Sequence, residues 1–362
     1  MHLRCSLLEL FTLKGLCLAQ IFFTPACFLT QVNEKGVPAL YFCFMKAMIY
    51  KKYGQPEVLQ LHNMEKPVPK KNEILIRVKA TAVNSGDIRL RKADPWAVRL
   101  FFGLTKPKKN ILGGVVSGIV EQVGHDVTLY KAGDEVFGST FPHFGAYAEY
   151  ICLPETATIG IKPAAITHEQ AAVIPFGATA AYYFIKQANI QPGQKVLIYG
   201  ASGAVGTAAV QLAKYFGAQV TAVCSAANAD MVGTLGADNV IDYNTGDFST
   251  NGECYDVIFD TMNKTSFRKC MSSLNKKGVL LLGASMGAGI FQKLWASVFS
   301  RKKVLAGMIK ESSKEISFLK ALIETSKLVP VIDRTYALEQ MAEAHAYVDK
   351  GHKKGNVAIT VS

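Results

Sequence analysis

Alternation of apolar and polar positions divides the sequence into a strand-rich first part and a second part in which strands and helices alternate. Five stretches of the first part show the period-two pattern or the glycine-bounded apolar runs that are typical of strands: Ala47–Tyr50, Glu73–Ala82, Ile111–Val123, Lys131–Phe137 and Gly145–Ile151. Because these runs are short and separated by turn residues, they predict a β-rich, barrel-like unit.

Near Thr167 the pattern changes to that of a long helix, and an apolar run that begins at Lys195 follows it. Further short strands are predicted after this run: Gln219–Cys224, Val240–Asp242, Asp256–Asp260 and Gly278–Leu282. Helical stretches lie between several of them, and strands that alternate with helices predict a parallel sheet with right-handed crossovers. The last strand-like stretch, Asn356–Val361, is expected to return to the β-rich unit.

The stretch Lys195–Gly206, K-V-L-I-Y-G-A-S-G-A-V-G, organises the second part. It predicts a strand, a glycine-rich turn and a helix that runs to Phe216, the opening unit of a dinucleotide-binding fold. Gly203 and Gly206 fit the last two glycines of G-x-G-x-x-G, and Ala201 takes the place of the first. Gly203 lets the backbone approach a pyrophosphate, and Gly206 lets helix and strand pack closely. A plain tight turn is the alternative interpretation.

Composition excludes a disordered chain and narrows the range of partners. Of 362 residues, 49% are hydrophobic and 19% are charged, which is enough apolar surface for two domains with cores. The net charge of +12 is unevenly spread, since no Lys or Arg occurs between Lys214 and Lys264. A solvated basic surface or steering of an anionic cofactor accounts for it, and without an RNA-binding motif no nucleic-acid partner is expected. The eight Cys form no C-x-x-C pair, which favours a reducing compartment.

Residues 1–44 do not share the pattern of the rest of the chain. Gly15–Leu29 is apolar but shorter than the roughly 20 residues of a membrane span. Glu9 and Lys14 interrupt the core of a secretory signal, and no A-x-A cleavage site follows. We interpret 1–44 as a disordered leader or non-native extension, with Met45 as the natural start and the cytoplasm as the location. A targeting or anchoring role is the alternative.

Two segments with aromatic and basic residues allow more than one interpretation. Trp96, Phe101 and Phe102 precede a lysine cluster at 106–109 and could line an apolar substrate pocket, touch a membrane surface or pack under a loop. Ile290–Lys303 places aromatic and basic residues at helical spacing. A packed or subunit-contact helix is expected there, hence a homodimer, with peripheral membrane contact as the alternative.

Taken in order, several short motifs carry a resemblance to a known family. They are Ala47–Tyr50, Ala82–Asp87, Val120–Gly124, Gly133–Phe137, Gly145–Glu149, Gly177–Ala181, Gly193–Lys214, Leu235–Asp238 and Gly355–Val361. The chain from Met45 onward resembles the medium-chain dehydrogenase/reductase superfamily, most of all its zinc-independent quinone oxidoreductase branch, which is related to zeta-crystallin. The resemblance implies an α/β protein with a GroES-like β-rich catalytic domain (45–170 and 310–362) around a Rossmann doubly wound parallel-sheet domain (171–309).

The resemblance also bears on zinc and on the reaction. Zinc-dependent relatives have a Cys in the loop that is Asn84–Asp87 here, a His-Glu pair at Gly113 and Gly114, and a four-cysteine lobe, none of which is present. A catalytic zinc needs about three protein ligands, and only His143 lies in a loop expected near the site, so no metal is expected. Hydride transfer without a Lewis acid favours small, apolar acceptors that are easily reduced, namely quinones and α,β-unsaturated carbonyls.

The resemblance assigns the cofactor contacts residue by residue. The implied cofactor-binding residues are Asn84 and Thr179 at the nicotinamide, Ala201, Ser202, Gly203, Ala204, Val205 and Gly206 at the pyrophosphate, and Ser225, Tyr243, Thr261, Ala284 and Asn356. Asn84, Ser85 and Tyr147 are the catalytic candidates. The two hydroxyls could donate a proton, and solvent is the alternative source. Some relatives have a Tyr directly after the Asp of this motif, where the chain has Ile88 and Arg89, so quinone specificity does not follow.

The end of the second strand indicates which cofactor binds. In Cys224–Asn228 no carboxylate is present to accept from a ribose hydroxyl, and the first one is Asp230. Ser225 can donate to a 2′-phosphate, and by resemblance Tyr243 does too. NADP(H) is therefore expected. NAD(H) is the alternative, because the segment lacks the basic residue that strengthens phosphate binding.

Two other functions stay open at this point. One is an alcohol or ketone dehydrogenase of the same superfamily. The other is a catalytically idle NADPH-binding protein with a crystallin-like or RNA-binding role.

Overall fold

A computed structural model of the chain describes residues 31–32, 38–39, 43–283, 301–307, 309 and 311–362. Ala284, the remainder of the glycine run to Gly289, and residues 290–300 lie outside the described residues. The homodimer prediction rested on that last segment, so it stays a prediction. Before residue 43 only a small antiparallel pair is described, β1 (Gln31–Val32) with β2 (Pro38–Ala39).

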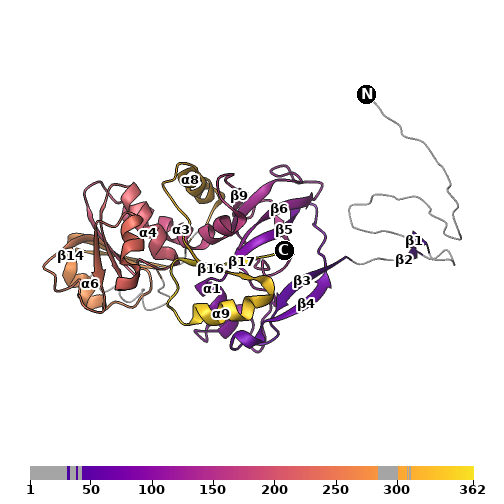
Figure 1. Cartoon of the computed structure of the whole chain (residues 1–362), viewed down its shortest axis with the longest axis horizontal. Helices are drawn as coiled ribbons and strands as arrows, with labels where there is room; N and C mark the ends of the chain where they lie inside the picture. Colours follow the sequence, from indigo (N-terminus) through magenta and orange to yellow (C-terminus); the bar gives the residue numbers. More distant parts are fainter. Residues whose placement is uncertain (1–30, 33–37, 40–42, 284–300, 308, 310) are drawn as a thin grey trace, which may run out of the picture.

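One half of the protein is a six-stranded sheet in which every neighbouring pair is parallel (Figure 1). Its strands are β10 (Lys195–Tyr199), β11 (Gln219–Cys224), β12 (Asn239–Asp242), β13 (Tyr255–Asp260), β14 (Leu274–Leu282) and β15 (Lys303–Ala306). The order β12-β11-β10-β13-β14-β15 reverses between β10 and β13, and such a switch point is where doubly wound sheets bind ligands. The predicted Rossmann architecture is confirmed.

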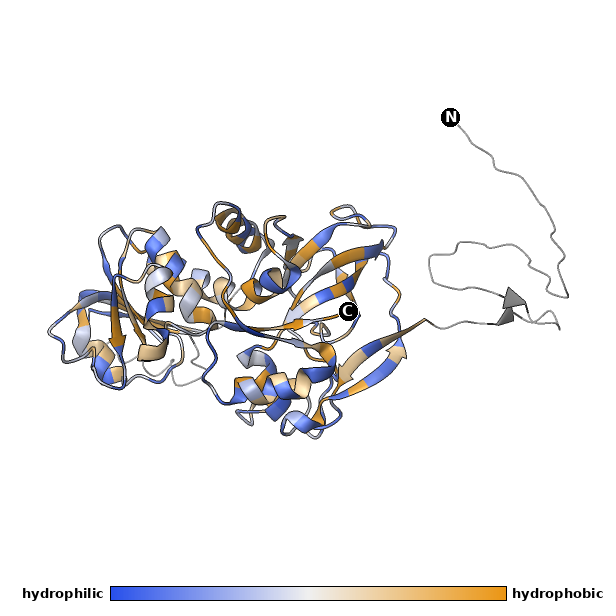
Figure 2. Cartoon of the chain, viewed as in Figure 1, coloured by the Kyte–Doolittle hydropathy of each residue, from blue (hydrophilic) through white to orange (hydrophobic). Residues whose placement is uncertain are grey.

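The other half is mainly antiparallel, as expected of a GroES-like unit. Its strands are β3 (Phe44–Ile49), β4 (Gln60–Glu65), β5 (Glu73–Ala82), β6 (Val115–Val123), β7 (Glu135–Ser139), β8 (Tyr150–Pro154), β9 (Ile159–Ile161), β16 (Ile332–Ala337) and β17 (Asn356–Thr360). Seven of them form one sheet, in which β17 pairs with β5, and β3 pairs with β4 separately. Apolar residues dominate its strands where they face the core (Figure 2). The last strand returns to the first unit, as predicted.

The helices cover and connect these sheets. They are α1 (Ser85–Lys92), α2 (Val98–Phe102), α3 (His168–Ala188), α4 (Ala204–Tyr215), α5 (Ala229–Thr234), α6 (Phe267–Ser273), α8 (Ser313–Glu324) and α9 (Met341–Asp349). Short 3-10 turns occupy Pro56–Val58, Ala226–Asn228 and Leu338–Gln340. No helix in the described ranges is both long and apolar enough to span a bilayer.

Helix α3 joins the two halves (Figure 1). It begins at a capping box in which Thr167 and Gln170 satisfy each other's backbone N–H groups, and it ends at Asn189 in the left-handed conformation. Small residues on its buried face allow close packing against both sheets. A Cβ at Gly177 would lie 2.4 Å from the carbonyl oxygen of Ala204, so α3 and the start of α4 touch through backbone.

Some predicted boundaries differ from the structure because turns precede the strands. Residues 145–149 are not a strand, since Phe144 and Gly145 both have positive φ and β8 begins only at Tyr150. Likewise Gly133 has positive φ, and β7 begins at Glu135. Lys303 opens strand β15, not the end of a helix. The domain boundaries at 170 and 310 stay a prediction.

Candidate active site

The glycine turn connects β10 to α4 at the switch point of the parallel sheet. Gly200 has a φ of +77°, so the residue that makes the turn is Gly200 and not the position of Ala201, which is fully buried. The three glycines of the turn are thus spaced G-x-x-G-x-x-G, and the assignment of Ala201 to the cofactor stays a prediction. Gly203 is the N-cap of α4, and a Cβ there would meet only the Gly200 carbonyl oxygen, at 3.6 Å. A Cβ at Gly206 would lie 2.1 Å from the same oxygen.

Backbone contacts bring three other segments to this turn. The N–H of Gly355 donates to the Ser202 carbonyl at 2.7 Å, which places the start of β17 beside the turn. The N–H of Val83 donates to the Val357 carbonyl at 3.0 Å, so the end of β5 lies alongside β17. With α3 packed on Ala204, the positions Asn84, Thr179 and Asn356 gather around one region.

Four buried polar atoms in the described part of the chain have no hydrogen-bond partner and belong to residues at this edge of the sheet. They are Nδ2 of Asn84, Oγ1 of Thr179, Oδ1 of Asn228 and Oδ1 of Asn356. All four residues are at most 8% exposed. Leaving a buried polar group unpaired costs about 1–3 kcal/mol, so such atoms call for a partner outside the chain. A dinucleotide with polar groups along its length fits this set.

Asn228 was not predicted from the sequence. It ends the 3-10 turn after β11, and its Nδ2 donates to the Ser225 Oγ at 3.1 Å. Ser225 thereby keeps its own O–H free for another acceptor. Tyr243, at the end of β12, is about half exposed. The Thr261 hydroxyl already donates to the Tyr199 carbonyl at 2.9 Å, so its remaining capacity is as an acceptor.

Asp87 holds the loop that presents Asn84. Its two carboxylate oxygens accept from the backbone N–H groups of Asn84 and Gly113, each at 3.1 Å. The side chain is 2% exposed. Burial raises the pKa of Asp87 to about 6, and these backbone hydrogen bonds act in the opposite direction. The Asp87 carboxylate therefore links the N-terminus of α1 to Gly113.

A row of buried polar side chains connects the Asp87 carboxylate, through Tyr147, to His345 on α9. The Tyr147 hydroxyl lies 3.1 Å from Nε2 of His345, and Nδ1 of His345 accepts from Nε of Arg91 at 3.2 Å. Arg91 also pairs with Asp349 at 2.5 Å. Since Arg91 occupies Nδ1, the proton of a neutral His345 sits on Nε2 and points to Tyr147. Burial, and then Arg91, hold the pKa of His345 well below its usual value.

This row of side chains bears on the role expected of Tyr147. Its side chain has no exposed surface, and its hydroxyl is engaged by His345. Burial, and then the Asp87 carboxylate, raise the pKa of Tyr147 well above its usual value, which makes it a poor acid. The raised pKa favours a positioning role, and proton donation by Tyr147 stays a prediction. Ser85 is exposed at the first position of α1.

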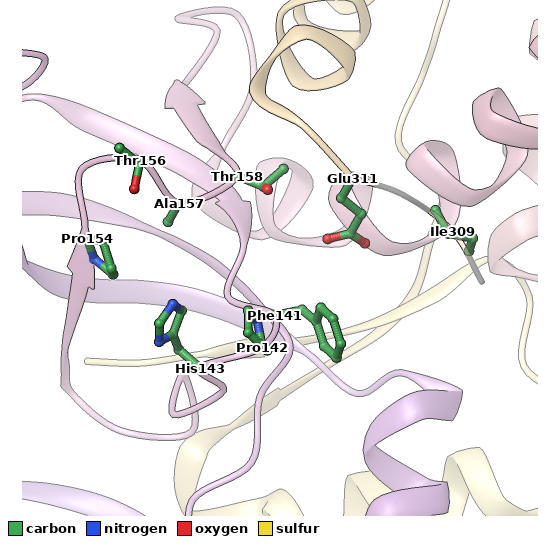
Figure 3. Close-up of a pocket in the computed structure, with 9 residues that line it drawn as sticks. All are labelled: Phe141, Pro142, His143, Pro154, Thr156, Ala157, Thr158, Ile309 and Glu311. Carbon is green, nitrogen blue, oxygen red and sulfur yellow. The ribbon is translucent and has the colours of Figure 1, made fainter. Parts of the chain in front are cut away.

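A cavity of about 310 Å³ is lined by residues 141–143, 154 and 156–158 of the antiparallel half and by Ile309 and Glu311 of the segment after β15. Figure 3 shows the Glu311 carboxylate pointing into it from the segment after β15, opposite His143 and Phe141. Oε2 of Glu311 is buried without a partner, and burial raises the pKa of this carboxyl. Phe141 packs edge-on against Phe144 at 5.8 Å, and Phe144 borders Gly114 beside Asp87. The cavity wall is thus continuous with the Asn84 loop.

The described part of the chain contains no cluster of metal-ligating side chains. No group of three or more His, Cys, Asp or Glu residues is arranged there to hold an ion. His143 is exposed at the cavity mouth.

Two family models match the chain. The alcohol dehydrogenase GroES-like domain matches residues 70–164, and the zinc-binding dehydrogenase model matches residues 235–359. The name of the second model refers to zinc, whereas Gly113 and Gly114 stand where zinc-dependent relatives have ligands.

Named relatives extend over most of the chain. A mitochondrial NAD(P)H oxidoreductase of Bos taurus, RTN4IP1, is 31% identical over 88% of this chain and 89% of its own. A chloroplastic NADPH-dependent alkenal/one oxidoreductase of Arabidopsis thaliana is 28% identical over 87% and 79%. A quinone oxidoreductase from Coxiella burnetii superposes with a TM-score of 0.80 at 28% identity, covering 88% of this chain and 100% of that one. The chain is therefore an oxidoreductase of the medium-chain dehydrogenase/reductase superfamily and belongs with its NAD(P)H and quinone oxidoreductases.

Proposed function

We propose that the protein reduces small apolar quinones or α,β-unsaturated carbonyls with NADPH, without a metal. The observation that carries this proposal is the set of four unpartnered buried atoms on Asn84, Thr179, Asn228 and Asn356. They come from four separate segments, of which α3 and the start of β17 touch the glycine turn directly and the end of β5 lies alongside β17. Hydrophobic packing alone does not explain why four buried polar atoms stay unpaired on these segments.

The residues present fit a nicotinamide dinucleotide. Ser202, Gly203, Ala204 and Val205 lie at the N-terminus of α4. The first N–H groups of a helix have no partner within the helix and can receive phosphate, although the N–H of Gly203 itself donates to the Gly200 carbonyl. Asn84 and Thr179 offer a donor and a hydroxyl for the nicotinamide end, and Asn356 offers an acceptor between them and the turn. When bound, the reduced nicotinamide supplies a hydride. Asn84 and Thr179 orient it, and orientation of this kind is worth several orders of magnitude in rate.

The acceptor class follows from the cavity and from the relatives. The cavity at Phe141 and Glu311 is of the size that ligand pockets start from. Its wall combines the Phe141 ring and apolar side chains such as Ile309 with polar groups, among them the Glu311 carboxyl, whose pKa is raised by burial. Two of the relatives act, by name, on quinones and on alkenals or enones. The support for a metal-free reaction is the absence of a zinc-ligand set at Gly113 and Gly114.

The full-length protein is expected to oxidise NADPH with a quinone or an enone at a rate that a chelator does not change. Loss of NADPH absorbance measures this directly, with NADH as the matched second cofactor and a simple ketone as the matched acceptor. Chelator-sensitive turnover of the ketone would instead support an alcohol or ketone dehydrogenase. Tight NADPH binding without turnover of any acceptor would support the idle binding protein.

The cofactor preference is expected to invert in Ser225→Asp. The new carboxylate would repel a 2′-phosphate and accept from a ribose 2′-hydroxyl, so the ratio of kcat/KM for NADPH to that for NADH should fall at least tenfold, about 1.4 kcal/mol. Ser225→Ala is the control, because it removes the free hydroxyl without adding charge. A wild type that prefers NADH tenfold, or an unchanged ratio in Ser225→Asp, would contradict the assignment of Ser225 to the phosphate.

The cellular location and the oligomeric state are predictions that two further experiments test. The relatives are named mitochondrial and chloroplastic, so a cytoplasmic location stays a prediction, and the alternative of targeting by 1–44 is equally open. Cell fractionation with an antibody to the folded part distinguishes them. Light scattering tests the homodimer.

A further inference from the structure

The segment after α1 exposes large apolar side chains to solvent. Trp96, Leu100, Phe101 and Leu104 are 63%, 57%, 77% and 60% exposed. We call these four residues the α2 patch. Isolated exposed apolar residues are ordinary, but four within nine positions form a patch of the kind that marks an interaction site.

The patch is presented on a fixed backbone. Val98 is buried, and Phe102 packs edge-on against Phe144 at 6.0 Å, so the inner face of α2 is anchored in the core. Hydrogen bonds from the N–H of Gly103 to Arg99 and from the N–H of Lys108 to Phe102 hold the following loop. The outer residues therefore have no room to turn inward. Ordinary packing under a loop, one of the interpretations of the sequence, does not describe Trp96 and Phe101.

Positive charge flanks the patch. Lys106, Lys108 and Lys109 are exposed, and within the described ranges none of them forms an ion pair. No acidic residue occurs from Pro95 to Asn110. Exposed tryptophan and phenylalanine beside unpaired lysines match the interface of an anionic bilayer, where rings enter the headgroup region and lysines meet acidic lipids.

We propose that the α2 patch docks the enzyme peripherally on an anionic lipid surface. A second copy of the chain fits less well, because a two-fold contact through this patch would place the lysines of both copies together. On the inner face of α2, Phe102 contacts Phe144, and Phe144 contacts Phe141 in the cavity wall, so α2 packs on the side of the protein that holds the cavity. If the proposed function holds, docking brings the enzyme to a lipid-soluble quinone held in the bilayer.

Vesicle binding tests the docking without any reference to catalysis. We would sediment the full-length protein with vesicles of phosphatidylcholine alone and of phosphatidylcholine mixed with phosphatidylserine. Binding only to the anionic vesicles, released by salt, is expected. Replacing Lys106, Lys108 and Lys109 by Gln should weaken partitioning about a hundredfold, at about 1 kcal/mol for each lysine. The double change Trp96→Ser and Phe101→Ser should abolish it, and Leu129→Ser, equally exposed outside the patch, should not.

A spectroscopic readout places the insertion at the patch. The chain has two tryptophans, so in a Trp295→Phe background the emission reports on Trp96 alone and should shift to shorter wavelength on anionic vesicles. Equal binding to both vesicle types, or unchanged binding of the double variant, would overturn the proposal. So would a wild-type dimer that the double variant converts to a monomer, since the patch would then be a protein interface.

Turnover with two kinds of quinone distinguishes failure of the membrane docking from failure of the proposed function. With a long-chain quinone held in vesicles, the double variant should lose turnover, whereas with a water-soluble short-chain quinone it should match the wild type. Vesicle binding without turnover of either quinone supports the docking and contradicts the proposed function. Turnover of both quinones at equal rates by the wild type and the double variant contradicts the docking.

Discussion

Gly203→Ala is expected to weaken NADPH binding about 5- to 150-fold while leaving the unliganded fold intact. A Cβ at this position meets only one atom, at 3.6 Å, and the backbone of this N-cap residue is extended, which any residue adopts. The methyl group therefore fits the free protein. It occupies the space through which a pyrophosphate approaches the turn, and overpacking of this kind costs about 1–3 kcal/mol.

Gly206→Ala is the matched contrast three residues later. Its Cβ would lie 2.1 Å from the Gly200 carbonyl and 2.7 Å from backbone atoms of Ala201. Because backbone must move to admit it, we expect the free energy of unfolding to fall by about 1–3 kcal/mol or more, whether or not NADPH is present. Urea unfolding of the free proteins and fluorescence titration with NADPH separate the two effects. Wild-type affinity in Gly203→Ala would show that the pyrophosphate does not approach this turn.

The glycine turn was predictable because its signals are local. A strand, its turn and the helix that follows lie within a few residues of one another, so the letters from Lys195 to Phe216 contain nearly the whole unit. The alternation of strands and helices then predicted the parallel sheet. The sequence does not show backbone angles. The positive φ of Gly200, by which this residue makes the turn, was therefore not predicted.

The buried side chains that hold the candidate site in place could not be predicted from local patterns. Arg91 and His345 are 254 positions apart, and His345 and Tyr147 are 198 apart. No local pattern marks a His on α9 as a partner of a Tyr in a loop, and the sequence therefore suggested Tyr147 as an acid. Its complete burial and its contact with His345 are visible only in the structure. Asn228 was missed for a related reason, since a polar residue after a strand is ordinary until its unpaired atom is seen.

Asp87→Asn is expected to lower kcat/KM about 10- to 150-fold at neutral pH. The carboxylate accepts one N–H on each oxygen, from Asn84 and from Gly113. An amide retains one acceptor and sets an NH₂ group against the other N–H. Losing a hydrogen bond to a charged group costs about 1.5–3 kcal/mol. The loop that carries Asn84 would shift as a result. The exposed Asp94→Asn is the control and should leave kcat/KM unchanged.

The pH dependence of stability in the same variant tests whether Asp87 is a buried carboxylate with a raised pKa. In the folded protein the pKa of Asp87 is raised from 3.8 to about 6, so the native state binds this proton more tightly than the unfolded chain does. The resulting stabilisation is present below pH 3.8 and is lost as the pH rises through 6. The unfolding free energy of the wild type minus that of Asp87→Asn should therefore fall by about 2.4 kcal/mol between pH 4 and pH 7. His345, whose neutral form is favoured by burial, contributes with the opposite sign but is present in both proteins, so its contribution cancels in the difference. A difference that stays constant across this range would show that Asp87 is ionised at the same pH whether the chain is folded or unfolded, and the argument for a buried carboxylate beneath Asn84 would fail.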